Sequence, residues 1–181
     1  MQTWQLAAHP DHPPLAVTGL SASMVGASEH WLRLRWRIDG AGVLELPPLA
    51  GKGRTDGLWE KTCFELFVAH GHGYAEYNFS PSERWAAYDF TGYRAGMTQR
   101  AMPRDPVCTM RRGSGGSSLA IFDAEVPLAG LPPLPWRMGL SAVIVEEGGH
   151  KSFWALAHAP GRPDFHHDTC FAVTLGAPEA A

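Results

Sequence analysis

Apolar and polar residues alternate with a period of two along most of this chain. The clearest run is 30–38 (HWLRLRWRI), in which four apolar side chains share one face and three arginines share the other. Alternation of this kind is typical of β-strands with one buried face. The remaining predicted strands are 18–25, 43–46, 62–69, 74–80, 84–90, 107–112, 117–126, 137–147, 151–158 and 170–175.

Glycine and proline separate these runs. The HGHG segment at 70–73 predicts a tight hairpin turn, because glycine accepts positive φ. The EEGGH segment at 146–150 predicts a second hairpin, and RRGSGGSS at 111–118 predicts a turn. Four prolines within 127–135 exclude a helix interior there, although a short helical turn fits 128–131. No segment has a long helical period. We therefore expect an all-β fold, an antiparallel β-sandwich of about ten strands.

The length and the net charge of the chain limit the kinds of protein it can be. The chain has 181 residues and a formal net charge of −3, so we expect a single domain over 1–181 and no general attraction to nucleic acid or anionic membranes. The first residues lack a secretory pattern, and no apolar run is long enough to cross a bilayer. The three cysteines form no CxxC pair, and Cys63 and Cys170 fall in apolar runs. These features predict a cytoplasmic protein with free thiols.

Aromatic residues and carboxylates are concentrated between 58 and 97. On a strand at 74–80, Glu76 and Asn78 face one way, and the apolar residues between them face the core. If the HGHG turn pairs this strand with 62–69, Glu65 shares their face. Two neighbouring carboxylates raise one pKa or recruit a cation. The alternatives are an ordinary solvated sheet face, or an ion pair with Arg84 or Arg94.

Two tryptophans stand out, and Trp59 is placed to stack on a ligand ring. Trp59 follows an Asp-Gly turn at the start of a strand. Trp154 and His158 share a face if 151–158 is a strand. The segment 158–168 also contains Asp164, His166, His167 and Asp168, which are competent metal ligands but lack a fixed motif spacing. We expect no metal site.

Signatures of common enzyme and cofactor classes are missing. The sequence has no GxSxG, no GxGxxG before a helix and no phosphate-binding loop. Haem bound by a histidine and Met97, Met102 or Met110 is conceivable, but there is no CxxCH motif and such methionines are usually core residues. We expect no cofactor. A glycosidase needs two carboxylates at a defined separation, and Glu65 and Glu76 are the candidates.

Three blocks of sequence resemble the DOMON-like proteins of proteobacteria. These are LWEKTCFELFV, YAEYNFSPSERWAAYDFTGYRAGM and FWALAHAPGRPDFHH, and the most specific part is Y-x-E-x-N-F-S-P-S. The group is related to type-nine carbohydrate-binding modules. The resemblance implies a jelly-roll-like β-sandwich that binds sugars or, in other branches, haem, and it implies non-catalytic binding more than catalysis. It also implies that Trp59 and Trp154 are the rings that hold a saccharide, with Glu65, Glu76 and Asn78 at its polar rim. The missing secretion signal departs from the extracellular relatives and favours an intracellular small molecule.

The sequence therefore predicts a non-catalytic binding module for a saccharide or a similar polar ring compound. The expected ligand-binding residues are Trp59, Glu65, Glu76, Asn78, Trp154 and His158. One alternative is a glycoside- or metal-dependent enzyme that uses Glu65, Glu76 and the 158–167 histidines. Another is a haem-binding electron-transfer module.

Overall fold

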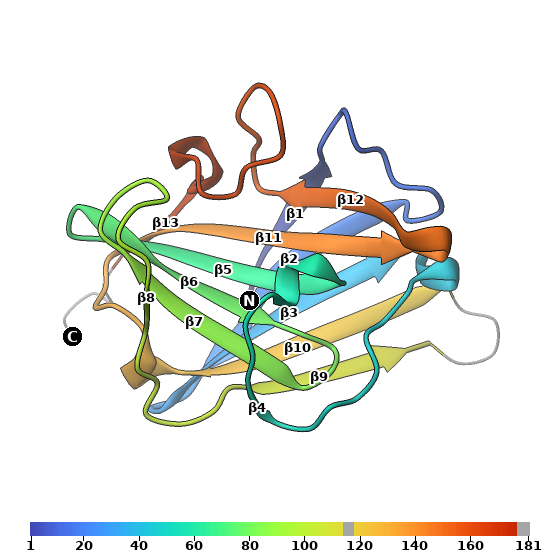
Figure 1. The fold of residues 1–181 in the computed structure, drawn as a ribbon. Helices are drawn as coiled ribbons and strands as arrows, with labels where there is room; N and C mark the ends of the chain where they lie inside the picture. Colours follow the sequence, from blue (N-terminus) through green and yellow to red (C-terminus); the bar gives the residue numbers. More distant parts are fainter. Residues whose placement is uncertain (114–117, 177–181) are drawn as a thin grey trace.

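The chain forms two layers of antiparallel strands that are joined along one edge (Figure 1). In this computed structural model, residues 1–113 and 118–176 are described. The back layer has the order β1 (Gln2–Ala8), β2 (Gly19–Ala27), β3 (Trp31–Asp39), β10 (Leu119–Pro127) and β9 (Val107–Arg112). The strongly alternating run at 30–38 thus becomes a central strand of this layer.

The front layer holds the strands richest in aromatic residues. Its order is β4 (Gly53–Arg54), β7 (Arg84–Phe90), β6 (Gly73–Phe79), β5 (Cys63–His70), β11 (Trp136–Glu146) and β12 (His150–Ala155). Two short strands join its sides: β8 (Thr98–Gln99) pairs with β7, and β13 (Val173–Leu175) pairs with β11. All pairs are antiparallel except β4 with β7.

Strand β1 connects the two layers. Its residues 2–6 pair with β2, whereas Ala7 and Ala8 pair with β12. One continuous sheet of 13 strands among the described residues therefore curls over on itself. The predicted all-β sandwich is confirmed, and the strands exceed the expected ten mainly because β1 and two-residue strands were not recognised in the sequence.

Several elements differ from the sequence-based expectation. Residues 43–46 do not form a strand; instead Ala41–Val43 is a 3₁₀ turn (η1), and Leu44 makes a single bridge to Glu146. The run at 170–175 is split between η5 (Asp168–Cys170) and β13. The remaining 3₁₀ turns are η2 (Leu58–Glu60), η3 (Leu128–Gly130) and η4 (Glu147–Gly149). The turn predicted at 111–118 falls partly outside the described residues.

Two hydrophobic clusters stabilise the fold. The larger one fills the space between the layers and is built from alternate residues of each strand, with Trp36, Phe64 and Phe122 in mutual ring contact. The second covers the outer face of the front layer and includes Phe67, Tyr74 and Phe165. Strands β5, β6 and β7 are therefore buried on both faces, so their outer side chains lie beneath loops. None of the helical segments in the described chain is long and apolar enough to span a membrane.

Candidate ligand-binding site

The β5–β6 hairpin places two glutamates on the outer face of the front layer. As predicted, HGHG forms the turn, with His70 opposite Gly73. This register puts Glu65 opposite Asn78 and Phe67 opposite Glu76, so the two glutamates occupy diagonal positions on one face. Glu65 is 3% exposed and Glu76 is 5% exposed. The predicted shared face of these residues is confirmed.

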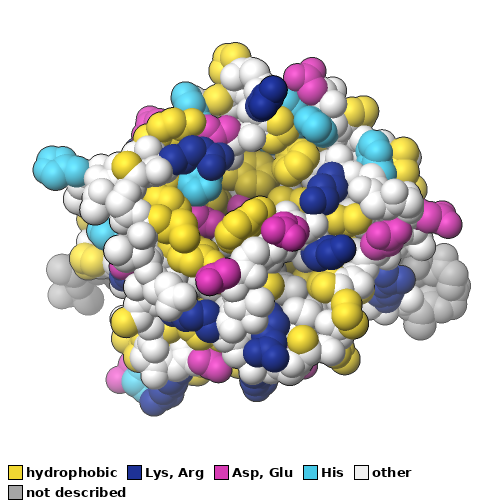
Figure 2. Space-filling view, viewed as in Figure 1, with side chains coloured by type: hydrophobic (Ala, Val, Ile, Leu, Met, Phe, Trp, Pro, Cys, Tyr) yellow, Lys and Arg dark blue, Asp and Glu magenta, His cyan; other side chains and the backbone are white. Residues whose placement is uncertain are grey.

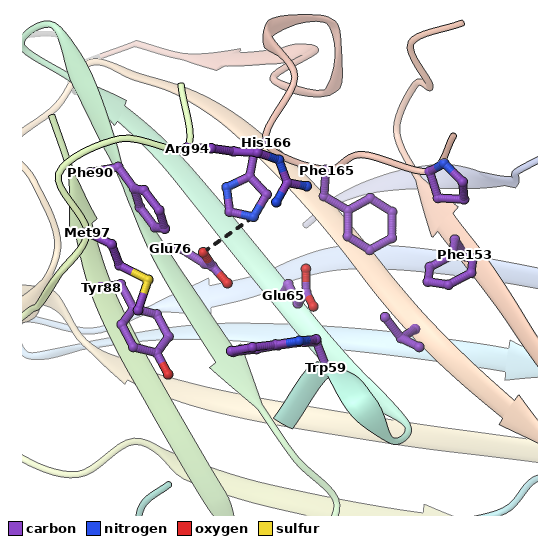
Figure 3. A pocket seen from close by; sticks show the side chains of 12 residues that line it. Trp59, Glu65, Glu76, Tyr88, Phe90, Arg94, Met97, Phe153, Phe165 and His166 are labelled. Carbon is purple, nitrogen blue, oxygen red and sulfur yellow. Dashed lines mark ion pairs between the residues drawn. The ribbon is translucent and has the colours of Figure 1, made fainter. Parts of the chain in front are cut away.

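The two carboxyl groups lie at the floor of a pocket of about 380 Å³. Figure 2 shows this hollow near the centre of the face, with hydrophobic side chains in and around it. Rings from four separate parts of the chain surround the floor in Figure 3. The pocket is lined by Trp59, Glu65, Glu76, Tyr88, Phe90, Arg94, Met97, Val143, Phe153, Pro163, Phe165 and His166. This volume is in the range of small-molecule sites, about 300–1,000 Å³.

Glu65 is a buried acid with one hydrogen-bond donor. The Ser141 hydroxyl, on the neighbouring strand β11, donates to Glu65 Oε2 at 3.2 Å. Burial raises the pKa of Glu65 well above its ordinary value, and the charge of Glu76 adds to this effect. No Arg, Lys or His of the described chain forms an ion pair with Glu65. Burial therefore disfavours the ionised form of this side chain.

Glu76 is held by a neighbour on its own strand. Asn78 Nδ2 donates to Glu76 Oε1 at 2.7 Å. Burial raises the pKa of Glu76 to about 7, although the Asn78 hydrogen bond and Arg94 act in the opposite direction. The Asn78 side-chain oxygen is buried and has no hydrogen-bond partner among the described residues. The floor of the pocket thus contains more acceptors than donors.

His166 forms one end of the pocket. Its Nε2 lies 3.8 Å from Glu76 Oε2, the contact marked by the dashed line in Figure 3. Burial lowers the pKa of His166 to about 4, and the positive charge of Arg94 contributes to this shift. At neutral pH the imidazole is therefore neutral, and its contact with Glu76 is too long for a hydrogen bond.

Arg94 lies at the rim of the pocket in a turn where it adopts a left-handed φ of 50°. Its Nη2 donates to Asp164 Oδ1 at 2.7 Å, and the Tyr93 hydroxyl donates to Asp164 Oδ2. Burial alone would raise the pKa of Asp164, but these hydrogen bonds outweigh it and the pKa is lowered. The guanidinium is thus paired with Asp164 at the rim and forms no ion pair with either floor glutamate, although its charge still lowers the pKa of Glu76.

The structure brings together only part of the predicted residue set. Trp59, Glu65 and Glu76 line the pocket, and Asn78 lies beside them. Trp59 is 42% exposed and belongs to η2, near Tyr88. These positions agree with the expected role of an aromatic wall above an acidic floor, while the binding role itself stays a prediction.

Trp154 and His158 must be removed from this set. Trp154 points into the core between the layers, and its indole N–H donates to Ser152 Oγ. The β12 residue that faces the pocket is Phe153. His158 lies beyond the end of β12, where its Nε2 bonds the Ala7 carbonyl oxygen at 2.8 Å. The expected shared face fails because β12 ends at Ala155, so strand alternation does not extend to His158.

The three histidines between 158 and 167 do not gather around one point, and His158 packs against His9 instead. His166 contacts Tyr74, and His167 Nδ1 accepts a hydrogen bond from the Thr169 backbone N–H at the start of η5. No group of three or more potential metal ligands is found in the parts of the chain that the structure describes. The alternative that uses 158–167 as a metal centre therefore has no structural basis in these residues.

Sequence reasoning did not assign several lining residues to the site. Tyr88 and Phe90 alternate on β7, so a pairing of β6 with β7 would have predicted them. Phe153 lies on the opposite face of β12 from Trp154, which was the face expected to meet the ligand. Phe165 and Arg94 lie in loops that fold over the sheet, and no local pattern in the sequence predicts where such loops lie.

Comparisons with solved structures agree with the fold. The chain is similar to a "putative carbohydrate-binding protein" from Bacteroides uniformis, with a TM-score of 0.64 and 12% identity over 93% of this chain and 83% of that one. It also matches a family 9 carbohydrate-binding module from Caldicellulosiruptor kristjanssonii in complex with glucose, with a TM-score of 0.40 and 10% identity over 79% and 69% of the two chains. No family model and no curated protein matches the sequence. At these identities, the similarity to the Bacteroides protein establishes a shared β-sandwich fold.

Proposed function

We propose that this protein is a saccharide-binding module whose site is the pocket above Glu65 and Glu76. The observation that supports this most directly is the combination of two buried carboxyl groups on the floor with aromatic rings around them. A sugar ring has apolar C–H faces and a polar rim of hydroxyls. Aromatic side chains bind the faces, and carboxyl, amide and imidazole groups bind the hydroxyls.

The individual groups suit this ligand. Trp59 is the most exposed ring of the pocket and can stack on a sugar face at the mouth. Glu65, Glu76 and His166 present acceptors and donors at the floor. Most of this polar surface is buried, and buried polar groups without hydrogen-bond partners are costly. Ligand hydroxyls that bond these groups therefore gain more free energy than hydroxyls that bind to an exposed flat surface.

Two similarities agree with the proposal. The Bacteroides protein of similar fold is described as a "putative carbohydrate-binding protein", which is support at the level of fold. The sequence blocks that resemble DOMON-like proteins include Trp59, Glu65, Glu76 and Asn78. The volume of about 380 Å³ favours a short saccharide rather than a long polymer within the pocket.

Calorimetric titration with a panel of neutral and amine-bearing mono- and disaccharides tests the proposal. We expect at least one to bind, and Trp59→Ala to weaken its affinity about tenfold or more. Trp31→Ala is the matched control, because Trp31 starts β3 in the other layer. Absence of binding across the panel, or equal losses in the two variants, would contradict the proposal.

A glycoside hydrolase is the second candidate, because one pocket contains two carboxyl groups whose pKa values are both raised. Glycosidases, however, combine a protonated acid with an ionised carboxylate. Incubation with aryl glycosides separates the two functions. The binding module gives no release of the aryl group, whereas the enzyme gives release that Glu65→Gln and Glu76→Gln abolish.

A further inference from the structure

Glu65 and Glu76 form a buried acidic pair that has no direct Arg or Lys partner among the described residues. The only hydrogen-bond donor to Glu65 is the Ser141 hydroxyl, and the only one to Glu76 is the Asn78 amide, among the described residues. Both side chains are more than nine-tenths buried and line the pocket. Burial of two neighbouring carboxyls is costly when they ionise, unless a positive charge is placed between or beside them.

The basic groups around the pocket do not supply that charge. Arg94 is the one Arg or Lys that lines it, and its guanidinium is bonded to Asp164. His166 is 3.8 Å from Glu76 and is hydrogen-bonded through Nδ1 to the Tyr74 hydroxyl. The floor therefore has a deficit of positive charge that a ligand can fill.

The floor also has a deficit of hydrogen-bond donors. Glu65 Oε1 has no donor within the described chain, and the buried Asn78 Oδ1, directly across the strand pair from Glu65, has none either. An ammonium group has three donors and no acceptor. An ammonium group therefore fits this floor better than a hydroxyl, which brings acceptor lone pairs as well as one donor.

Aromatic faces are the third element. Figure 3 shows the rings of Trp59, Tyr88, Phe90, Phe153 and Phe165 around the two carboxyls. The negative faces of aromatic rings attract a cation, most strongly when it is removed from water. Rings and carboxyls together thus favour a cation at the floor of the pocket.

Building on the proposed saccharide site, we propose that its ligand is an amino sugar with a free, protonated amine, and that Glu65 and Glu76 bind the ammonium. The sugar ring then lies against Trp59, and its hydroxyls point to His166 and the mouth. Binding releases any protons that the two carboxyls hold in the empty pocket. An N-acetylated sugar lacks the charge and is discriminated against.

Titration calorimetry at about neutral pH with four compounds tests this inference. Glucosamine contains ring and amine, glucose and N-acetylglucosamine contain the ring without the charge, and ethanolamine contains the amine without the ring. We expect glucosamine to bind at least about tenfold more tightly than each of the other three. Glu65→Gln and Glu76→Gln keep the side-chain size and should reduce the preference for glucosamine over glucose to about threefold or less. The matched control Glu125→Gln, on β10 of the other layer, should leave it unchanged.

The outcomes separate this inference from the proposed function. Glucose that binds as tightly as glucosamine in the wild-type protein overturns the ammonium assignment and leaves a neutral saccharide site in place. Ethanolamine that binds as tightly as glucosamine overturns the amino-sugar assignment, because the ring then contributes nothing. If no sugar binds, the proposed function fails and this inference fails with it.

Discussion

The Tyr74 hydroxyl lies 2.7 Å from His166 Nδ1 and also accepts the backbone N–H of Arg94 at 3.2 Å. Burial raises the pKa of Tyr74, so the phenol keeps its proton. Nδ1 is the one acceptor within reach of the phenol proton among the described residues, so we expect the hydroxyl to donate to Nδ1. The imidazole proton of His166 must then be on Nε2, which faces Glu76 and the pocket. One tyrosine thus sets the tautomer that a ligand meets.

Tyr74→Phe tests this relationship. The variant leaves His166 Nδ1 and the Arg94 N–H without their partner, so we expect the free energy of unfolding to fall by about 1–2 kcal/mol. In nitrogen-15 NMR spectra, the wild-type His166 should be the Nε2–H tautomer, and the variant should show a mixture. Tyr93→Phe is the control, because Tyr93 contacts Asp164 at the exposed rim. An unchanged tautomer in Tyr74→Phe would refute the assignment.

Glu76 predicts a particular dependence of stability on pH. Its pKa is about 7 in the folded protein and about 4.5 without burial. Between these values the folded state keeps a proton that the unfolded chain has released, so stability falls as the pH rises through this window. Glu76→Gln removes this loss. The free energy of unfolding of the variant relative to the wild type should therefore increase from pH 4.5 to pH 7, by up to about 3 kcal/mol. Urea unfolding at several pH values measures it.

His166 predicts the opposite slope. Its pKa is about 4 in the folded protein against 6.5 without burial. Between these values the unfolded chain binds a proton that the folded state does not, so this group makes stability rise with pH. His166→Asn should therefore lose stability relative to the wild type as the pH rises from 4 to 6.5. If the free energy of unfolding changed with pH in the same way in both variants and in the wild type, the buried environment of Glu76 and His166 would be contradicted.

Trp154 and Trp59 should respond to substitution in opposite ways. Trp154 is buried in the core, so Trp154→Ala should lower the free energy of unfolding by about 3–5 kcal/mol. Trp154→Phe keeps the core filled and should leave saccharide affinity within about twofold. Trp59→Ala should reduce affinity and change stability by less than about 1 kcal/mol, because the ring is 42% exposed. Loss of saccharide binding in Trp154→Phe would contradict the assignment of the ligand site to the pocket described above.

The strand phase of Trp154 shows a limit of sequence analysis. Period-two alternation distinguishes a buried face from a solvated one, as in the run at 30–38, where leucines and arginines alternate. In FWALA at 153–157 both faces are apolar, because one side of β12 meets the core and the other meets the loops. Hydrophobicity alone therefore could not decide whether Phe153 or Trp154 faces the ligand pocket.

The acidic floor was predictable, because Glu65 and Glu76 are polar residues within otherwise apolar strands and the HGHG turn sets their register. The residues that form the walls of the pocket were harder to predict. Arg94, Pro163 and Phe165 reach the pocket from loops between 91 and 97 and between 156 and 167. Their positions depend on tertiary contacts such as Arg94 with Asp164, which join residues that are 70 positions apart.

The hairpin turn itself can be tested at its two glycines. A Cβ on Gly73 would lie 1.8 Å from the Phe90 carbonyl oxygen on the adjacent strand. We expect Gly73→Ala to lower the free energy of unfolding by about 2–3 kcal/mol, since the two strands must separate locally. Gly71→Ala is the matched control: it meets nothing within 4 Å and has a φ of 55°, so the cost should be about 1 kcal/mol. Equal effects in thermal unfolding would contradict the close β6–β7 packing.

The most direct test of the central claim is a crystal structure of the protein with the tightest-binding saccharide from the titrations. The account predicts a sugar ring in the pocket, stacked on Trp59, with its polar groups bonded to Glu65 and Glu76. A saccharide bound instead at the other layer, or one that leaves both carboxyl groups untouched, would contradict it.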